Sequence, residues 1–380
     1  MQRKTTPAWL EKVPRFSFQE AHVPFQNDTN YLGGLFSSAN EIIHPVRGHT
    51  KGQIPGWLKG VLLKNGPGLF EFGNGEEVAH VFDGQAMIQG HNILNSSKSV
   101  ISRRLIQSDI LKKNLNEKRF AGLGAWAVPS EWTMIDRLKA MTGGGMADNS
   151  NVAIICLFGH FYATTESPIV HEFDPITQAT IRRVEIAKIA PALKDMKTMT
   201  PHPLHDQDGT LWNLGMFVTS TGIKTGIFKV PPPQNEEQKK NPWLNAQLVT
   251  TVPSSRSFSF PYFHSFWMTP NYVIYPEQPY IIADVFVAFW HFVVKGGSFM
   301  DTMYWDKSSM TSFKIIEKTS GKVLPSQYTT EPMAYYHIIN AYEEDNHIIL
   351  DAPFNSKQSY DFMNMNLVKV QHKMYLPFIA

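Results

Sequence analysis

Three histidines stand beside aromatic residues in settings that suit metal ligands. His202 lies in TMTPHPLHDQDG, His264 in FSFPYFHSFWMTP and His337 in EPMAYYHIINAYEED. Neutral imidazole is a good ligand for iron, zinc and copper. Histidines that are far apart in sequence can converge if their strands surround one axis. Each of them taken singly more often fills a hydrogen-bonded core or turn position, so the residues alone leave both roles open.

The chain around these histidines is predicted to be all-β. From Trp57 onward, β-branched and aromatic runs such as ATIRRVEI and TLWNLGMFVTS alternate with Gly, Pro, Asn and Asp. Runs of about 4–8 residues with turn signals between them are typical of repeated antiparallel sheets. One helix is expected over Glu131–Met141, and a solvated loop over Val230–Pro242, VPPPQNEEQKKNP.

Two glycine-containing motifs predict tight turns in the first part of the chain. Asn65–Gly68 reads NGPG, in which the glycines allow positive φ and Pro67 restrains the backbone. Phe82–Gly84 reads FDG and is expected to form a second turn. Both motifs are interpreted as scaffold.

Composition excludes several classes of protein. The 380 residues carry a formal net charge of +2, which gives no electrostatic support for a nucleic-acid partner. The single cysteine, Cys156, rules out a disulfide framework and a cysteine-based metal site. The N-terminus has no apolar core of a secretory signal, so a cytoplasmic protein is expected. The longest apolar stretch, Tyr280–Val294, is interrupted by Asp284 and His291 and is too short to span a bilayer.

Several motifs in a fixed order resemble the carotenoid cleavage oxygenase family. They are LKGVLLKNGPGLFEFGNGEEVAHVFDGQAMI, MADNSNVAIICLFGHFYATTESPIVHEFDP, HPLHDQDGTLWNLG, YFHSFWMTPNYVIYPEQP and HIINAYEED. The family includes the animal β-carotene oxygenases and the retinal pigment epithelium isomerohydrolase. The similarity runs from about Tyr31 to Pro377. It implies an irregular segment over residues 1–30, followed by one carotenoid oxygenase β-propeller domain over residues 31–380.

The resemblance implies a seven-bladed β-propeller with short helical segments on the face of a substrate tunnel. In the family, four histidines on the propeller axis hold iron, Fe(2+). His202, His264 and His337 match the first three of these ligands. Glu166, in YATTES, matches a glutamate that accepts the outer N–H of a ligating imidazole, which fixes its tautomer.

The resemblance also implies a peripheral membrane surface at the tunnel mouth. The family segment in question corresponds to Gly124–Gly145, in which Trp126, Trp132 and Ile135 are apolar. Tyr280–Phe292 could complete the same patch. A carotenoid is nearly insoluble in water, so its transfer from a bilayer into an apolar tunnel is physically sensible. Ordinary buried packing is the other interpretation of these residues.

The expected activity is iron-dependent cleavage of a double bond in a carotenoid or apocarotenoid by O2, which gives aldehyde or ketone products and places the protein in carotenoid and retinal metabolism. An isomerohydrolase acting on retinyl esters without oxygen is one alternative. A protein that binds a polyene without turning it over is another.

The match also predicts an incomplete propeller. Met374–Ala380, MYLPFIA, corresponds to a family segment about two-thirds along the chain, ahead of the fourth ligand and the final blades. His347 and His372 lie in a strand start and a polar stretch and do not replace that ligand. Unpaired strand edges favour aggregation, so the chain alone is expected to aggregate and to have little activity as a truncated isoform or an incomplete gene model.

Overall fold

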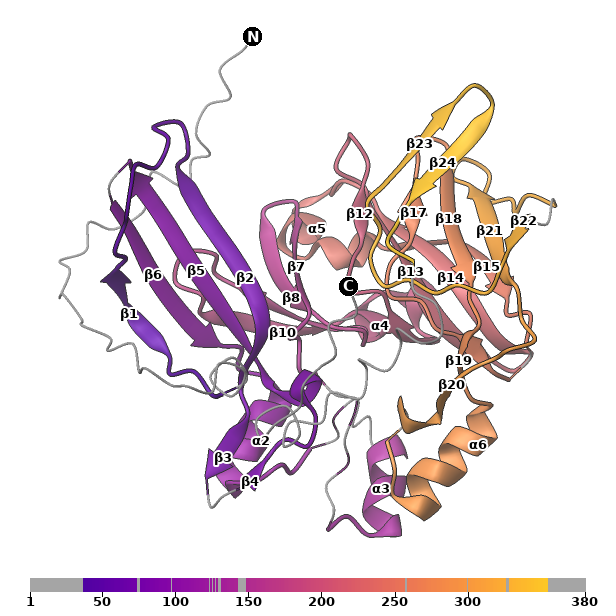
Figure 1. The fold of residues 1–380 in the computed structure, drawn as a ribbon, viewed down its shortest axis with the longest axis horizontal. Coiled ribbons are helices and arrows are strands. Elements are labelled where there is room, and N and C mark those ends of the chain that lie inside the picture. Colours follow the sequence, from indigo (N-terminus) through magenta and orange to yellow (C-terminus); the bar gives the residue numbers. More distant parts are fainter. Residues whose placement is uncertain are drawn as a thin grey trace.

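A computed structural model describes residues 37–354, apart from positions 74–75, 97, 123, 125, 127, 129–130, 143–147, 257, 299 and 326–327. Antiparallel β-sheets dominate that part of the chain, as the apolar runs predicted (Figure 1). The irregular segment expected over residues 1–30 and the stretch Met374–Ala380 lie outside the described residues.

The first two sheets each contain four strands. The first sheet has the order β1-β6-β5-β2, and the second has the order β10-β9-β8-β7, in which each strand pairs with its neighbour in sequence. The strands of the first sheet are β1 (Ile42–Arg47), β2 (Gly60–Leu69), β5 (Gln85–Asn95) and β6 (Lys98–Leu105). Those of the second are β7 (Ala153–Leu157), β8 (His160–Thr164), β9 (Ile169–Phe173) and β10 (Thr180–Glu185).

Three further sheets follow in the second half. The third comprises β11 (Met196–Met199), β12 (Leu204–His205), β13 (Leu211–Thr219), β14 (Gly222–Val230) and β15 (Gln247–Pro253). The fourth comprises β16 (Phe260–Pro261), β19 (Tyr280–Ile282) and β20 (Met303–Trp305). The fifth comprises β17 (Trp267–Met268), β18 (Tyr272–Glu277), β21 (Thr311–Glu317) and β22 (Tyr328–Thr330). Two hairpins are formed by β3 (Glu71–Gly73) with β4 (Glu76–Glu77), and by β23 (Asn340–Glu344) with β24 (His347–Asp351).

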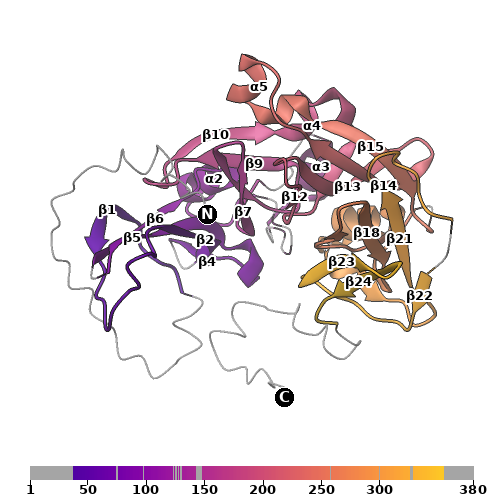
Figure 2. The same ribbon diagram turned by 90° about the horizontal axis from the view of Figure 1, so that it is seen from above.

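The sheets follow one another along an arc, from the first through the second and third to the fifth (Figure 2). Neighbouring sheets share apolar clusters: Ile88 of the first packs with Phe173 of the second, and Leu214 of the third packs with Val273 of the fifth. This succession of packed antiparallel sheets is how propeller blades are arranged. Within the described residues, however, the arc does not close into a ring.

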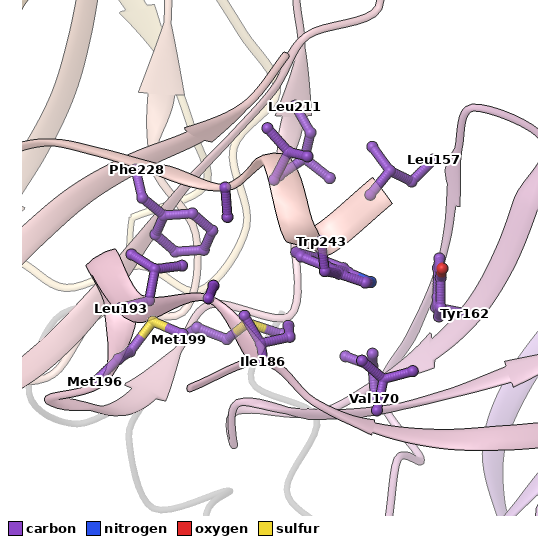
Figure 3. Close-up of a cluster of buried hydrophobic side chains, with 14 of the residues drawn as sticks. Leu157, Tyr162, Val170, Ile186, Leu193, Met196, Met199, Leu211, Phe228 and Trp243 are labelled. Atoms are coloured by element: carbon purple, nitrogen blue, oxygen red, sulfur yellow. The ribbon is translucent and has the colours of Figure 1, made fainter. Parts of the chain in front are cut away.

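The largest apolar cluster lies between the second and third sheets. Trp243, in the 3₁₀ helix Pro242–Asn245, is fully buried there against Tyr162 of β8 and Phe228 of β14 (Figure 3). Burying a side chain of this size contributes about 1.5–3 kcal/mol or more to folding. The polar segment before it, predicted as a solvated loop, contains the short exposed helix α5 (Glu236–Lys240).

The tight turn predicted at Asn65–Gly68 is wrong, because these residues continue β2. Gly66 pairs with Met87 and Pro67 with Ala86 of β5, and neither glycine has positive φ. Pro67 is tolerated because β2 is an edge strand. Gly68 is required by close approach, since a Cβ there would lie 2.5 Å from that of Met87. The second turn is confirmed as the 3₁₀ helix Val81–Asp83, closed by Gly84.

The helices are short and lie beside the sheets. They are α2 (Asp109–Glu117), α3 (Met134–Thr142), α4 (Ile186–Ile189), α5 and α6 (Val285–Trp290), with 3₁₀ turns at Pro191–Leu193 and Met300–Thr302. The helix predicted over Glu131–Met141 is therefore confirmed in position. Helix α6 continues into a π-helical turn, His291–Lys295, which ends at Gly296 in the left-handed region. Arg137 of α3 donates a hydrogen bond to the carbonyl oxygen of Val293 (3.1 Å), so the two helical segments lie together (Figure 1).

A charged cluster fixes α5 to the second sheet. The Glu172 carboxylate on β9 accepts a hydrogen bond from Arg182 Nε (2.5 Å) and lies 2.7 Å from His160 Nδ1. His160 Nε2 lies 2.8 Å from the carbonyl oxygen of Lys239, and Arg182 Nη2 donates to that of Lys240 (2.8 Å). Cations at the last carbonyls of a helix stabilise it.

Candidate metal centre and its cavity

The three histidines singled out in the sequence converge at one point. His202 follows β11, His264 lies between β16 and β17, and His337 precedes β23. One ring nitrogen from each lies within 4.8 Å of the other two. His202 Nε2 and His264 Nε2 are 2.9 Å apart. The imidazole ring centroids are separated by 4.6, 4.9 and 5.0 Å.

Buried threonine and asparagine side chains position His202. Thr200 Oγ1 accepts from the backbone N–H of His202 (3.3 Å) and donates to Asn213 Oδ1 (2.6 Å). Asn213 Nδ2 in turn donates to the carbonyl oxygen of Thr200 (2.8 Å). Thr164 Oγ1 donates to the carbonyl oxygen of Pro201 (3.2 Å). The loop that carries His202 is therefore fastened to both the second and the third sheet.

Glu166 lies behind His264. Its Oε1 is 2.7 Å from His264 Nδ1, and it also accepts a hydrogen bond from the Tyr262 hydroxyl. The carbonyl oxygen of Glu166 accepts from the backbone N–H of Met199 (2.9 Å), which holds this segment against β11. A carboxylate on Nδ1 favours the tautomer that carries its proton there, so the lone pair of Nε2 is directed toward His202.

Partial desolvation lowers the pKa of two of the imidazoles. It lowers the pKa of His202 to about 3, with a smaller contribution from His264 and His337. Burial and then the proximity of His264 also lower the pKa of His337. Neutral imidazoles whose ring nitrogens face one another at such short distances present lone pairs to a shared point. This donor set, with one carboxylate behind it, fits a divalent transition-metal ion such as iron(II).

The three histidines line a cavity of about 460 Å³. Its wall is rich in aromatic rings, from Phe82, Trp126, Tyr262 and Tyr336. Asn65, Gly66 and Pro67 line it as well, although the sequence suggested only a scaffold role for them. These three residues belong to β2 and pair with β5, so their place in the cavity wall becomes apparent only once β2 is known to continue through NGPG. Size and lining suit an apolar ligand.

Trp126 is held in this wall by two residues of the Phe82–Gly84 region. The His80 ring stacks on its indole at 4.7 Å between centroids, with an angle of 12° between the planes. The Asp83 carboxylate accepts from the backbone N–H of Trp126 (3.2 Å). Trp126 thus belongs to the cavity, whereas Ile135 lies on the outer face of α3 with 62% of its surface exposed. Trp132 is half-buried beneath Lys113, whose Nζ lies 5.8 Å from the ring centroid.

Helices α3 and α6 together expose a large apolar surface. Its members are Met134, Ile135, Leu138, Phe286, Val287, Phe289, Trp290 and Val294. Isolated apolar residues are common on protein surfaces, but a contiguous group marks a contact surface. Among the described residues, none of the helices has the length and apolarity required to cross a bilayer.

The family described as Retinal pigment epithelial membrane protein matches residues 35–375. The β,β-carotene 15,15'-dioxygenase of Rattus norvegicus is 31% identical over 321 residues, which are 82% of this chain and 55% of that protein. The dioxygenase of the same name from Gallus gallus is 30% identical over 327 residues, 83% of this chain and 60% of that one. The chain therefore spans little more than half the length of these relatives.

Solved structures show the same fold. A variant of the Synechocystis apocarotenoid oxygenase superposes with a TM-score of 0.67 at 16% identity, and a cobalt-substituted form of that enzyme with 0.67 at 18%. Each match covers 85% of this chain and 63% of the solved chain. Fold, ordered motifs and identity agree, and the chain belongs to the retinal pigment epithelial membrane protein family, which is the family of the carotenoid cleavage oxygenases.

Proposed function

We propose that this chain provides an iron(II) site and a polyene-binding cavity for oxidative cleavage of a carotenoid or apocarotenoid double bond. The observation that carries the proposal is the convergence of His202, His264 and His337 in the wall of a cavity rich in aromatic rings. The relatives named as carotene dioxygenases support the substrate class. The arc of antiparallel sheets supports a propeller, and the family resemblance suggests seven blades as the complete architecture, with residues 31–380 belonging to it.

In this proposal the three imidazoles hold the iron, and Glu166 retains the proton on His264 Nδ1. Bound iron(II) would supply the ability to bind and activate O2. The rings of Phe82, Trp126 and Tyr336 exclude water and hold the polyene, so that one double bond lies beside the histidines. Cleavage adds one oxygen atom of O2 to each carbon of that bond and gives two carbonyl products. No other oxidant is needed.

The test separates cleavage from the ester reaction of the isomerohydrolase branch. The 380-residue chain is loaded with Fe²⁺ and supplied in detergent with β-carotene or with all-trans-retinyl ester. Oxygen uptake that matches aldehyde formation from β-carotene supports the proposal. Retinol formation from the ester without oxygen uptake would support the isomerohydrolase alternative. Polyene binding without either product would identify a binding protein.

We also propose that the exposed apolar surface of α3 and α6 rests on a membrane surface. Both helices turn several large apolar side chains outward, and this supports the proposal. Burial of these side chains in the interfacial region of a bilayer would lower the free energy. Ile135→Asp and Phe286→Asp are expected to move the protein out of the lipid fraction in liposome flotation. Ile181→Asp is the matched control, because Ile181 is 58% exposed on β10. Equal flotation of all variants would refute the proposal.

A further inference from the structure

Two loop segments carry His264 and His337 to the candidate metal centre. The first, residues 262–265, follows β16, and the second, residues 335–337, precedes β23. His337 is itself exposed, so packing around its own ring does not fix its position. The geometry of the site therefore depends on how the residues next to His264 and His337 are held together.

Gln278 links the two segments from the end of β18. Its Oε1 accepts from the backbone N–H of Tyr335 (3.0 Å), and its Nε2 donates to the carbonyl oxygen of Tyr262 (2.5 Å). The side chain is 1% exposed. A donor is needed on one side and an acceptor on the other, and a carboxamide provides both at once. Neither a carboxylate nor an apolar side chain can satisfy both partners.

Ser265 and Tyr335 form a second link. The Ser265 hydroxyl donates to the carbonyl oxygen of Tyr336 (2.5 Å), and the Tyr335 hydroxyl donates to the carbonyl oxygen of Ser265 (2.6 Å). Both residues are almost completely buried. The Tyr335 ring packs on Trp267 with 4.5 Å between centroids, and Trp267 Nε1 donates to the carbonyl oxygen of Asp351 in β24 (3.2 Å). The link is thus anchored in the fifth sheet and in the second hairpin.

We propose that Gln278, Ser265 and Tyr335 are positioning residues that set the separation of His264 and His337. We call these three residues the bracket. This proposal depends on the proposed metal site, because the role of the bracket is to hold two ligands at the spacing that one ion needs. Four hydrogen bonds fix residues on both sides of His264 and the two residues that precede His337. A metal site requires its ligands within about 0.5 Å of the productive geometry.

The chain offers a matched control for Gln278. Gln178 is also 1% exposed and also bonds backbone carbonyls, but it lies in the turn between β9 and β10. Gln278→Met and Gln178→Met each replace a buried carboxamide by an apolar side chain of similar length. Both variants are titrated as 380-residue chains with Co²⁺, and binding is followed by visible absorption. Gln278→Met is expected to bind about 10-fold more weakly than the unchanged chain, as is usual when a supporting contact is lost. Gln178→Met is expected to bind within about twofold of it.

Two further variants keep the test valid if Gln278→Met does not fold. Tyr335→Phe removes one oxygen and leaves the ring against Trp267, and Ser265→Ala has its control in Ser102→Ala, since Ser102 is buried and donates to Gln178. Both bracket variants are expected to weaken Co²⁺ binding several-fold more than Ser102→Ala does. Equal affinities in bracket and control variants would overturn the proposal.

NMR of the imidazole signals in the metal-free chain distinguishes failure of the bracket from failure of the metal site. The His264 and His337 signals are expected to shift in Tyr335→Phe and to remain in place in Ser102→Ala. Unmoved signals in Tyr335→Phe would overturn the bracket whatever the metal does. Shifted signals in a chain that never binds Co²⁺ would support the bracket as a structural link and would refute the proposed metal site alone.

Discussion

Two carboxylate–histidine pairs in this molecule have the same contact distance but differ in what the second ring nitrogen faces. Glu166 lies 2.7 Å from His264 Nδ1, and Glu172 lies 2.7 Å from His160 Nδ1. The other nitrogen of His264 faces His202 Nε2, whereas that of His160 faces the carbonyl oxygen of Lys239. The carboxylate contact is therefore common to both pairs, and the second neighbour distinguishes them.

That second neighbour determines what the pair can do. Because both nitrogens of His160 face acceptors, both contacts are satisfied only by the protonated ring. The hydrogen bond with Glu172 raises the pKa of His160 despite partial burial. Burial alone would raise the pKa of Glu172, but hydrogen bonds from His160 and Arg182 lower it. This pair is a charged link to α5, whereas the lone pair of His264 remains directed at a site shared with other imidazoles.

The largest expected effect comes from removing a histidine at the candidate metal centre. His202→Ala is expected to lower the iron content of the 380-residue chain well below one ion per chain and to abolish whatever product formation that chain supports, because two imidazoles cannot replace three. His160→Ala, the matched change in the other pair, is expected to leave the iron content unaltered. Iron analysis and the β-carotene assay measure both. Full occupancy and normal turnover in His202→Ala would contradict the assignment of the site.

Replacing each of the two carboxylates by an amide is expected to affect metal binding in one case and folding stability in the other. Glu166→Gln should weaken metal binding about 10–100-fold, because an outer partner of a ligating histidine is altered. Glu172→Gln should leave metal binding unchanged and lower the free energy of unfolding by about 1–3 kcal/mol, because the negative charge is lost and either His160 or Arg182 faces an NH2 group in place of an acceptor oxygen. Metal titration and urea denaturation of both variants test this. The comparison fails if each variant affects both properties equally.

The smallest expected effect is a pH dependence that belongs to His160. Its pKa is raised above the ordinary value of 6.5, so its stabilising contribution is complete below about that pH and is lost as pH rises through the folded-state pKa. Glu172, Arg182 and the ring of Tyr162 are the groups that face it. The difference in unfolding free energy between the unchanged chain and His160→Gln should shrink from pH 6 toward about pH 9. A difference that is constant with pH would show that the pKa of His160 is the same in the folded and unfolded states.

The sequence was most informative where a motif combines a rare residue with its neighbours. His202, His264 and His337 could be singled out because each stands in an aromatic strand-edge motif, the family resemblance then favoured a ligand role for them, and the structure brings them together. The all-β class and the helix near Met134 were also predictable, since they depend on local periodicity.

The residue roles that the sequence did not reveal depend on packing between distant segments. Gln278 and Gln178 look alike in the sequence, and only the fold shows that one of them joins the segments that carry two histidines. The NGPG motif was mistaken for a turn because glycine is required both by positive φ and by close approach. Only the pairing of β2 with β5 distinguishes the two. His80, which stacks on Trp126, carries no sequence signal for that contact.

The local pairing within each sheet also has a kinetic consequence. The second sheet and both hairpins are built from strands that are neighbours along the chain, so they can form through short loops, which is the fast class of contact in folding. The three histidines come from loops attached to different sheets, and they meet only after those sheets have packed on one another. A metal ion that requires all three therefore binds to the assembled state and stabilises it by mass action. Added metal should accordingly lower the unfolding rate more than it raises the folding rate.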